Sequence, residues 1–112
     1  MSGPSLSTHV LDTSSGKPAA GVTVSLARLE GDRAVAVSEA RTDADGRVPN
    51  LARDLAPGSY RLSFEVGAYF RAQGHGSLFG RVTLELDVAA DGRHYHLPLL
   101  VSPFACVAYR GS

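Results

Sequence analysis

The chain has 112 residues, which fits a single domain with a hydrophobic core of its own. Lysine and arginine together number 11, and aspartate and glutamate together number 11, so the formal net charge is zero. This balance argues against nucleic acid and anionic membranes as partners, favours a small ligand or a protein, and favours a homo-oligomer because copies of the chain have little charge repulsion.

Alternation of apolar and polar residues predicts short, half-buried β-strands in the first half of the chain. The alternation is present at 22–26 and 60–66, and two further strand candidates lie at about 6–11 and 33–42. In the segment 60–66, which reads "YRLSFEV", one face carries Tyr60, Leu62, Phe64 and Val66. Each alternating strand therefore offers one face to a core and the other to solvent.

The second half continues this pattern after an interruption. The segment "GAYFRAQGHGS" at 67–77 breaks the alternation with three glycines and predicts either a loop or one short helix. The motif "VTLELDV" at 82–88 alternates again, with Thr83, Glu85 and Asp87 on the solvent face. Two further strand candidates lie at about 94–101 and 104–110.

Clusters of turn residues separate the candidate strands, among them "DTSSGKPAAG", "DADG", "APGS" and "ADG". About seven short strands with turns every 8 to 12 residues or so are typical of an antiparallel β-sandwich. No linker, internal repeat or low-complexity tract divides the sequence. The sequence therefore predicts an all-β fold in one domain over residues 1–112.

Targeting signals are not evident in the sequence. The opening "MSGPSLSTHVLD" lacks a basic stretch followed by an apolar run, and no later segment approaches the roughly 18 apolar residues of a membrane span. The single Cys106 lies in an apolar run, which predicts a buried thiol in a reducing compartment. We therefore expect a cytoplasmic protein that starts near Met1 and has no membrane partner.

Histidines raise the question of a metal site. In "HYH", His94 and His96 would share one face of a strand, a spacing that zinc ligands use. Cys106 lies across the expected hairpin, but no carboxylate or further histidine is visibly spaced to complete the ligand set. The sequence therefore predicts no metal, and a metal-dependent enzyme is the weakest alternative.

The motif "DADG" at 43–46 has a superficial likeness to a calcium loop. Its glycine comes fourth, whereas the glycine of an EF-hand loop comes sixth, after three alternating oxygen ligands. We expect a turn in which Asp43 and Asp45 cap the backbone and Gly46 supplies a positive φ.

The remaining polar groups in apolar surroundings are few. They are His9 in "LSTHVLD", Arg47 after the "DADG" turn, His96 in "HYHLPLL" and the terminal "YRGS". Taken singly, each is most simply an ordinary core or surface residue. No phosphate-binding loop, nucleophile elbow or paired-carboxylate motif accompanies them.

Taken together, three segments resemble the 5-hydroxyisourate hydrolases, the transthyretin-like enzymes of urate breakdown. The segments are "STHVLDTSSGKPAAGVTVSL", "TDADGR" and "HYHLPLLVSPFACVAYRGS", and the resemblance spans essentially the whole chain. The first two, with "LAPGSYRLSF", also resemble non-catalytic transthyretin-like modules and so imply the fold alone. The "THVLD" histidine, "HYHLP" and "YRGS" imply the hydrolase, because thyroxine-carrying transthyretins lack the last motif.

The resemblance implies a transthyretin-like antiparallel sandwich of about seven to eight strands with one short helix. It implies conversion of 5-hydroxyisourate to 2-oxo-4-hydroxy-4-carboxy-5-ureidoimidazoline without metal or cofactor. It also implies a homotetramer in which edge strands pair into dimers and the sites lie at the dimer–dimer interface. The alternative is a non-catalytic transthyretin-like module that binds a small ligand or a protein.

The resemblance also implies which residues form the site. The catalytic residues would be His9, Arg47, His96 and Ser112, and the substrate-binding residues would be Tyr109, Arg110 and Gly111. His94 stays outside this set and is expected beside His96 on the same strand face.

Hydrolysis of a cyclic ureide needs an activated water, a stabilised oxyanion and a proton for the departing nitrogen. An imidazole with a pKa of about 6.5 can take a proton from water, and a nearby guanidinium keeps it neutral. We expect His9 and His96 to share the acid and base roles and Arg47 to act as a fixed cation. Which histidine is the principal base stays open, as does whether Ser112 acts through its hydroxyl or its carboxylate.

Overall fold

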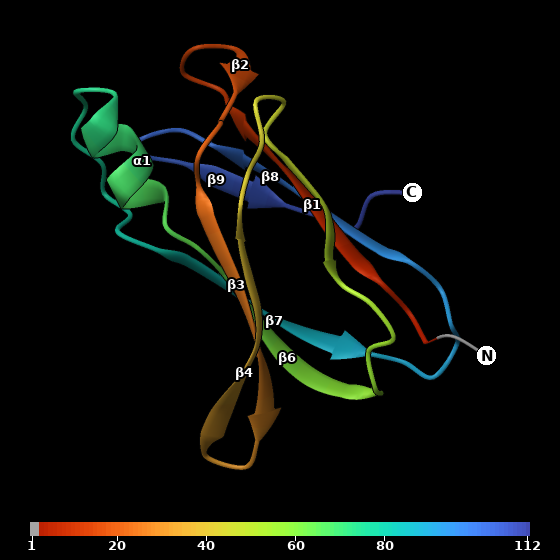
Figure 1. Cartoon of the computed structure of the whole chain (residues 1–112). Coiled ribbons are helices and arrows are strands. Elements are labelled where there is room, and N and C mark those ends of the chain that lie inside the picture. Colours follow the sequence, from red (N-terminus) through yellow and green to blue (C-terminus); the bar gives the residue numbers. More distant parts are fainter. Residues whose placement is uncertain (1–2) are drawn as a thin grey trace.

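The computed structural model describes residues 3–112. Two β-sheets pack face to face, and their strands and the single helix follow one another along the chain as shown in Figure 1. The elements are β1 (Leu6–Asp12), β2 (Lys17–Pro18), β3 (Thr23–Glu30), β4 (Arg33–Arg41), β5 (Arg47–Ala52), β6 (Gly58–Phe64), α1 (Val66–Ala72), β7 (Val82–Val88), β8 (Tyr95–Val101) and β9 (Cys106–Ala108).

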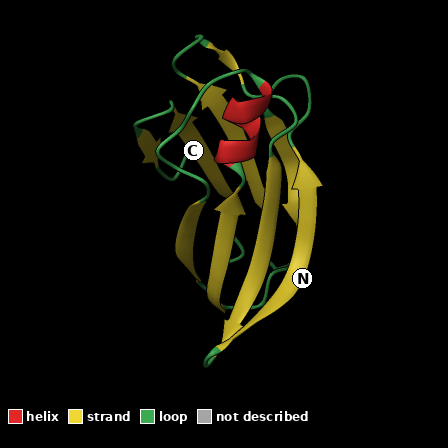
Figure 2. Ribbon diagram, turned by 90° about the vertical axis from the view of Figure 1, so that its left-hand side faces the viewer, coloured by secondary structure: helices red, strands yellow, loops and turns green. Residues whose placement is uncertain are grey.

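One sheet has the strand order β2-β1-β8-β9, with β5 also paired to β1, and is called here the β1–β8 sheet. The other has the order β4-β3-β6-β7 and is called the β3–β6 sheet. Helix α1 lies at the same end of the sandwich as β2, while the β3–β4 hairpin extends from the opposite end (Figures 1 and 2). The all-β sandwich with one short helix that the sequence predicted is confirmed.

The core lies between the two sheets and contains the apolar residues that the alternation assigned to it. Tyr60, Leu62 and Phe64 of β6 are almost fully buried, whereas Thr83, Glu85 and Asp87 of β7 are exposed, as expected. The prediction for residue 66 was wrong in one respect: Val66 is buried, but it begins α1 instead of ending the strand. The segment after Phe64 therefore folds as the short helix that the sequence left as one of two alternatives.

The sequence did not predict that β1 and β8 would pair in parallel. Their register places Ser7 opposite His96 and His9 opposite Pro98, in a sheet whose other pairs are antiparallel. A parallel pair needs a long connection, and almost the whole sandwich lies between these two strands. This pairing brings the two histidine-bearing strands side by side.

The sequence did not predict strand β5, because its apolar pattern is weak. Only Val48 and Leu51 of its residues are buried, and Pro49 interrupts it. Proline is tolerated in a strand at a sheet edge, where its missing N–H leaves no ladder bond broken. This strand pairs with β1 so that Arg47 lies opposite His9.

The "DADG" turn fixes the start of β5 against β1. The carboxylate Oδ1 of Asp43 accepts from the backbone N–H groups of Asp45 and Arg47, both at 2.9 Å. Gly46 has a φ of 76°, and its carbonyl accepts from the Val10 N–H at 2.7 Å. The turn that the sequence predicted is confirmed, although Asp43 alone supplies the capping carboxylate.

The expectation of a buried Cys106 was wrong. The thiol is exposed because β9 is a three-residue edge strand in which every residue is exposed. Apolar sequence alone did not reveal that this strand lies outside the core. Over residues 3–112, no helix has the length and apolar character needed to span a membrane.

Candidate active site

A row of polar side chains lies on the outer face of the β1–β8 sheet, the face turned away from the β3–β6 sheet. In β1, Leu6, Thr8 and Val10 point into the core and are nearly inaccessible to solvent. Because side chains alternate along a strand, Ser7 and His9 share the outer face. Their register partners on β8 and β5 share that face with them, which places His96 and Arg47 there.

His9 is half buried and held by one hydrogen bond. Its Nε2 lies 2.9 Å from the backbone carbonyl oxygen of Asp45, in the turn that precedes Arg47. A carbonyl only accepts, so Nε2 carries the proton and donates it. The lone pair of the neutral His9 ring is consequently on Nδ1, which is the nitrogen left to accept a proton.

His96 is the second imidazole of this face. Its Nδ1 lies 2.8 Å from the Oγ of Ser7, and Nε2 has no hydrogen-bond partner within residues 3–112. Burial lowers the pKa of His96 from its usual value, and nearby positive charge lowers it further, from His9, His94 and Arg47 in that order. His96 is therefore held neutral at neutral pH, the state that a general base requires.

Arg47 supplies the permanent cation of the site. Its backbone is fixed by the Asp43 cap, whereas its side chain is exposed. In the part of the chain that the structure describes, no hydrogen bond or ion pair engages the guanidinium. A planar fork of donors is therefore available to an oxygen-rich ligand placed between Arg47 and the two imidazoles.

The "YRGS" segment returns to His96. The N–H of Gly111 donates to the carbonyl oxygen of His96 at 2.7 Å, which forms an isolated antiparallel bridge. A Cβ at position 111 would lie 2.6 Å from Cδ2 of His96 and 3.3 Å from Cγ of Pro98. Only a glycine lets the chain pass this close to the imidazole ring. Tyr109 and Ser112 are exposed on either side of this contact.

Arg110 contacts Tyr95 and the backbone of His94. Its guanidinium carbon lies 4.2 Å from the centre of the Tyr95 ring, and one of its nitrogens donates to the carbonyl oxygen of His94 at 3.3 Å. Both contacts hold the "YRGS" segment against the start of β8. Direct binding of substrate by Arg110 stays a prediction, as do the roles given to Tyr109, Gly111 and Ser112.

The metal arrangement considered from sequence is not assembled around His96. Cys106 pairs with Val101, five positions along β8 from His96, which is roughly 16 Å at strand spacing. Within residues 3–112, no three histidine, cysteine, aspartate or glutamate side chains come together in a group that could hold a metal ion.

Sequence reasoning missed Ser7 and saw His94 only as a neighbour of His96. The Oγ of Ser7 lies 2.8 Å from Nε2 of His94 as well as 2.8 Å from Nδ1 of His96. The signal was the spacing in "STH": Ser7 and His9 are two residues apart and therefore share a strand face. The parallel register that brings Ser7 to His96 was not visible in the sequence.

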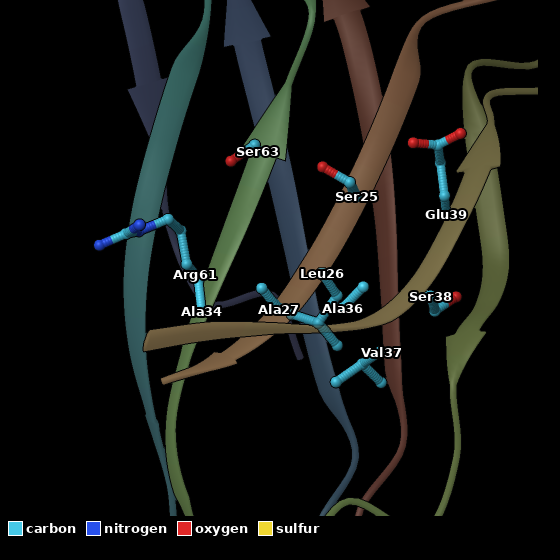
Figure 3. Close-up of a pocket in the computed structure, with 10 residues that line it drawn as sticks. All are labelled: Ser25, Leu26, Ala27, Ala34, Ala36, Val37, Ser38, Glu39, Arg61 and Ser63. Carbon is cyan, nitrogen blue, oxygen red and sulfur yellow. The ribbon is translucent and has the colours of Figure 1, made fainter. Parts of the chain in front are cut away.

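A hollow of about 380 Å³ lies on the outer face of the β3–β6 sheet, on the far side of the sandwich from His9. Its floor is formed by small side chains, including Ser25, Ala27 and Ser63, and its charged groups Arg61 and Glu39 lie on opposite sides (Figure 3). No histidine or nucleophilic cysteine lines it. The candidate active site is therefore the histidine-bearing face of the β1–β8 sheet.

Comparison with known proteins agrees with this fold. A protein from Caulobacter vibrioides named 5-hydroxyisourate hydrolase is 46% identical, with 100% of both chains covered. The structure of Klebsiella pneumoniae 5-hydroxyisourate hydrolase superposes with a TM-score of 0.84 at 41% identity, covering 97% of this chain and 94% of that one. Sea bream transthyretin in complex with thyroxine superposes with a TM-score of 0.90 at 30% identity, covering 95% and 93%. The model of the HIUase/Transthyretin family matches residues 6–111, and the chain belongs to this family.

Proposed function

We propose that this protein is a hydrolase that converts 5-hydroxyisourate to 2-oxo-4-hydroxy-4-carboxy-5-ureidoimidazoline, a cyclic amide hydrolysis of urate catabolism. Relatives with the hydrolase name match the whole chain at 46% identity. The observation that carries the proposal is the placement of two imidazoles and a guanidinium, those of His9, His96 and Arg47, on one sheet face. These are the groups that the reaction requires.

In the proposed mechanism, a neutral imidazole takes a proton from water as the water attacks the substrate carbonyl. Nδ1 of His9 and Nε2 of His96 are the nitrogens available for this step, and the protonated ring then gives the proton to the departing nitrogen. The Arg47 guanidinium stabilises the oxyanion. Typical contributions are about 3 kcal/mol for a preorganised donor and about 10² to 10⁴ in rate for a positioned base, so no metal is needed.

The "YRGS" segment completes the proposed site. Gly111 lies against His96, and Ser112 follows it directly in the chain. We propose that Ser112 hydrogen-bonds substrate or water. Tyr109 and Arg110 precede this contact and are proposed to bind substrate together with Gly111. This assignment rests on the motif and on the position of Gly111.

We also propose that the protein acts as a homotetramer. In a single chain the site lies on a sheet face that exposes Arg47, and the adjacent edge strand β9 and its flanks expose Phe104, Val107 and Tyr109. Pairing of edge strands between copies would cover this apolar surface, and apposition of two such dimers would enclose the site. The substrate would then bind at the dimer–dimer interface.

A non-catalytic binding module is the second candidate, since a thyroxine-bound transthyretin shares the fold. The test is to generate 5-hydroxyisourate from urate with urate oxidase, add the protein, and follow the decay of ultraviolet absorbance with and without a chelator. Acceleration over the spontaneous decay in both conditions supports the metal-free hydrolase. Unaccelerated decay with folded protein contradicts it, and acceleration lost on chelation contradicts the metal-free mechanism.

A further inference from the structure

Four side chains form a continuous line of hydrogen bonds from the site to the surface. Nδ1 of His96 lies 2.8 Å from Oγ of Ser7, and the same Oγ lies 2.8 Å from Nε2 of His94. Nδ1 of His94 lies 2.5 Å from Oγ of Ser5. Ser7 has only 8% of its surface exposed, whereas His94 is exposed, so the line runs from a nearly buried hydroxyl to solvent.

The number of protons on each group restricts how these bonds are arranged. A serine hydroxyl donates one hydrogen bond, and a neutral imidazole donates from one nitrogen and accepts at the other. If both histidines donated to Ser7, the Ser7 proton would have no acceptor within the described residues, because His94 and His96 are the partners of this hydroxyl there. Every proton has an acceptor only when Ser7 donates to one histidine and accepts from the other. If Ser7 donates to His96, then His94 donates from Nε2; if Ser7 donates to His94, then His96 donates from Nδ1.

In each of these two arrangements, every hydrogen bond of the line has one donor and one acceptor. Each arrangement also gives both histidines the same tautomer. In the first, His94 and His96 both carry the proton on Nε2, and the Ser5 hydroxyl donates to Nδ1 of His94. In the second, both carry it on Nδ1, and His94 donates to Ser5. Only the second leaves the lone pair of His96 on Nε2, the nitrogen without a protein partner within residues 3–112.

We propose that Ser7 and His94 form a proton path that couples His96 to solvent and sets its tautomer. The proposal rests on the hydrolase function proposed above. Ser7 and His94 are positioning residues, because they act through His96 instead of touching the substrate. His94, absent from the "THVLD" and "YRGS" motifs, thereby gains a role.

Nε2 of His96 takes a proton from the attacking water, while the Nδ1 proton of His96 passes to Ser7, whose own proton passes to Nε2 of His94. The Nδ1 proton of His94 leaves to Ser5 and solvent. One proton has then moved from the site to solvent, and His96 is neutral with a proton on Nε2, ready to donate it to the departing nitrogen. The reverse sequence returns the path to its starting state.

The first test needs no substrate. Nitrogen-15 NMR of the imidazoles at about pH 8, well above the usual pKa of about 6.5, reports the tautomer of each neutral ring. We expect His94 and His96 to show the same tautomer or the same mixture, with His9 as a reference fixed by its bond to a carbonyl. In Ser7→Ala the two rings should change independently. Opposite tautomers in the parent protein, or unchanged tautomers in Ser7→Ala, would overturn the path.

The second test distinguishes proton transfer through Ser7 and His94 from a role in which they only hold the His96 ring in position. We expect Ser7→Ala to lower kcat about tenfold or more while KM changes less than about threefold, and Ser7→Thr, which keeps the hydroxyl, to restore most of the rate. His94→Gln keeps a hydrogen bond to Ser7 but cannot exchange tautomers, so it should lose as much kcat as Ser7→Ala. Parent-like kcat in His94→Gln would show that support suffices and would overturn proton transfer.

Ser63→Ala is the matched control, because Ser63 lies on β6 in the other sheet and bonds only Thr83 through its side chain within the described residues. Its kcat should equal that of the parent. If the parent protein itself does not turn over 5-hydroxyisourate, the proposed function fails while the tautomer measurement still decides the hydrogen-bonded arrangement. The two failures are therefore distinguishable.

Discussion

Gly111 lies against the imidazole of His96, so close that a Cβ at position 111 would stand 2.6 Å from the ring carbon Cδ2. The backbone bridge between the same two residues prevents the chain from moving aside without losing a hydrogen bond of 2.7 Å. The orientation of the His96 ring therefore depends on Gly111 on one side and on Ser7 on the other.

We expect Gly111→Ala to displace the His96 ring and to lower kcat/KM by about tenfold or more, since small displacements of a catalytic group are costly. The melting temperature should change little, because position 111 lies outside the hydrophobic core. Steady-state kinetics and thermal unfolding measure the two effects. Gly76→Ala is the matched control, since a Cβ at Gly76 meets no atom within 4 Å; equal kinetics in the two variants would contradict the contact.

Replacement of Arg47 tests the fixed cation. We expect Arg47→Gln to lower kcat/KM by about 10² or more through loss of oxyanion stabilisation, and Arg47→Lys to recover only part of it because an ammonium lacks the forked geometry. Folding should be unaffected, since the side chain is exposed and makes no bond within residues 3–112. Arg33→Gln, at the tip of the β3–β4 hairpin, should keep parent kinetics. Full activity in Arg47→Gln would remove Arg47 from the site.

The pKa of His96 should rise when Arg47 is neutralised. Burial is the largest cause of the lowered pKa, and the charge of Arg47 adds to it by disfavouring the imidazolium. In the parent protein, His96 should therefore stay neutral below the usual value of about 6.5, and the rate should fall only at still lower pH. NMR titration of His96 in the parent and in Arg47→Gln measures the shift, with Arg33→Gln as the control. A lower pKa in Arg47→Gln would contradict the sign.

Tyr69 of α1 joins the helix to the end of β1, and its removal should affect stability more than catalysis. Its hydroxyl donates to Oδ2 of Asp12 at 2.9 Å, and burial together with this carboxylate raises the pKa of Tyr69 to about 12. We expect Tyr69→Phe to lower the free energy of unfolding by about 1 to 2 kcal/mol, the usual effect of losing a hydrogen bond to a charged group. Urea unfolding measures it, and Tyr109→Phe, an exposed position, should leave stability unchanged.

The same bond predicts a dependence on acid. Burial alone would raise the pKa of Asp12, but hydrogen bonds from Ser14, Tyr69 and Ser15 outweigh it and lower the pKa. A carboxyl with a lowered pKa in the folded state contributes stability above its unfolded value of about 3.8, and this contribution is lost as the pH falls through the folded value. Tyr69→Phe should therefore lose less stability than the parent on acidification. A steeper loss would contradict the assigned cause.

Sequence patterns predicted the parts of the fold in which local physics decides the structure. The alternation at Tyr60–Phe64 and Val82–Val88 revealed which residues enter the core, because period two leaves one choice of face. The "DADG" turn was predictable because glycine tolerates a positive φ and an aspartate caps the backbone beside it. Strand β5 was missed because its burial pattern does not distinguish it from a loop. Strand β9 lies within the strand predicted at 104–110, but its apolar sequence did not reveal that it is an exposed edge.

The site was predictable only through motifs, and its arrangement came from long-range pairing. Nothing in the spacing of "THVLD" and "HYHLP" reveals that β1 and β8 pair in parallel with Ser7 opposite His96. That register is set by the packing of the whole sandwich. For this reason the sequence proposed His9, Arg47 and His96 as candidates but did not reveal the bonds that orient them, or that Arg110 lies on Tyr95.

The parallel pairing of β1 with β8 also determines when the site can form. Ser7 and His96 are 89 positions apart, and Gly111 comes later still. During synthesis, β1 with His9 is made early, and it can pair with β8 only after the residues between the two strands have been made. Contacts of such long sequence separation form slowly. The candidate site is therefore assembled near the end of folding, and a partly translated chain that lacks β8 cannot form it.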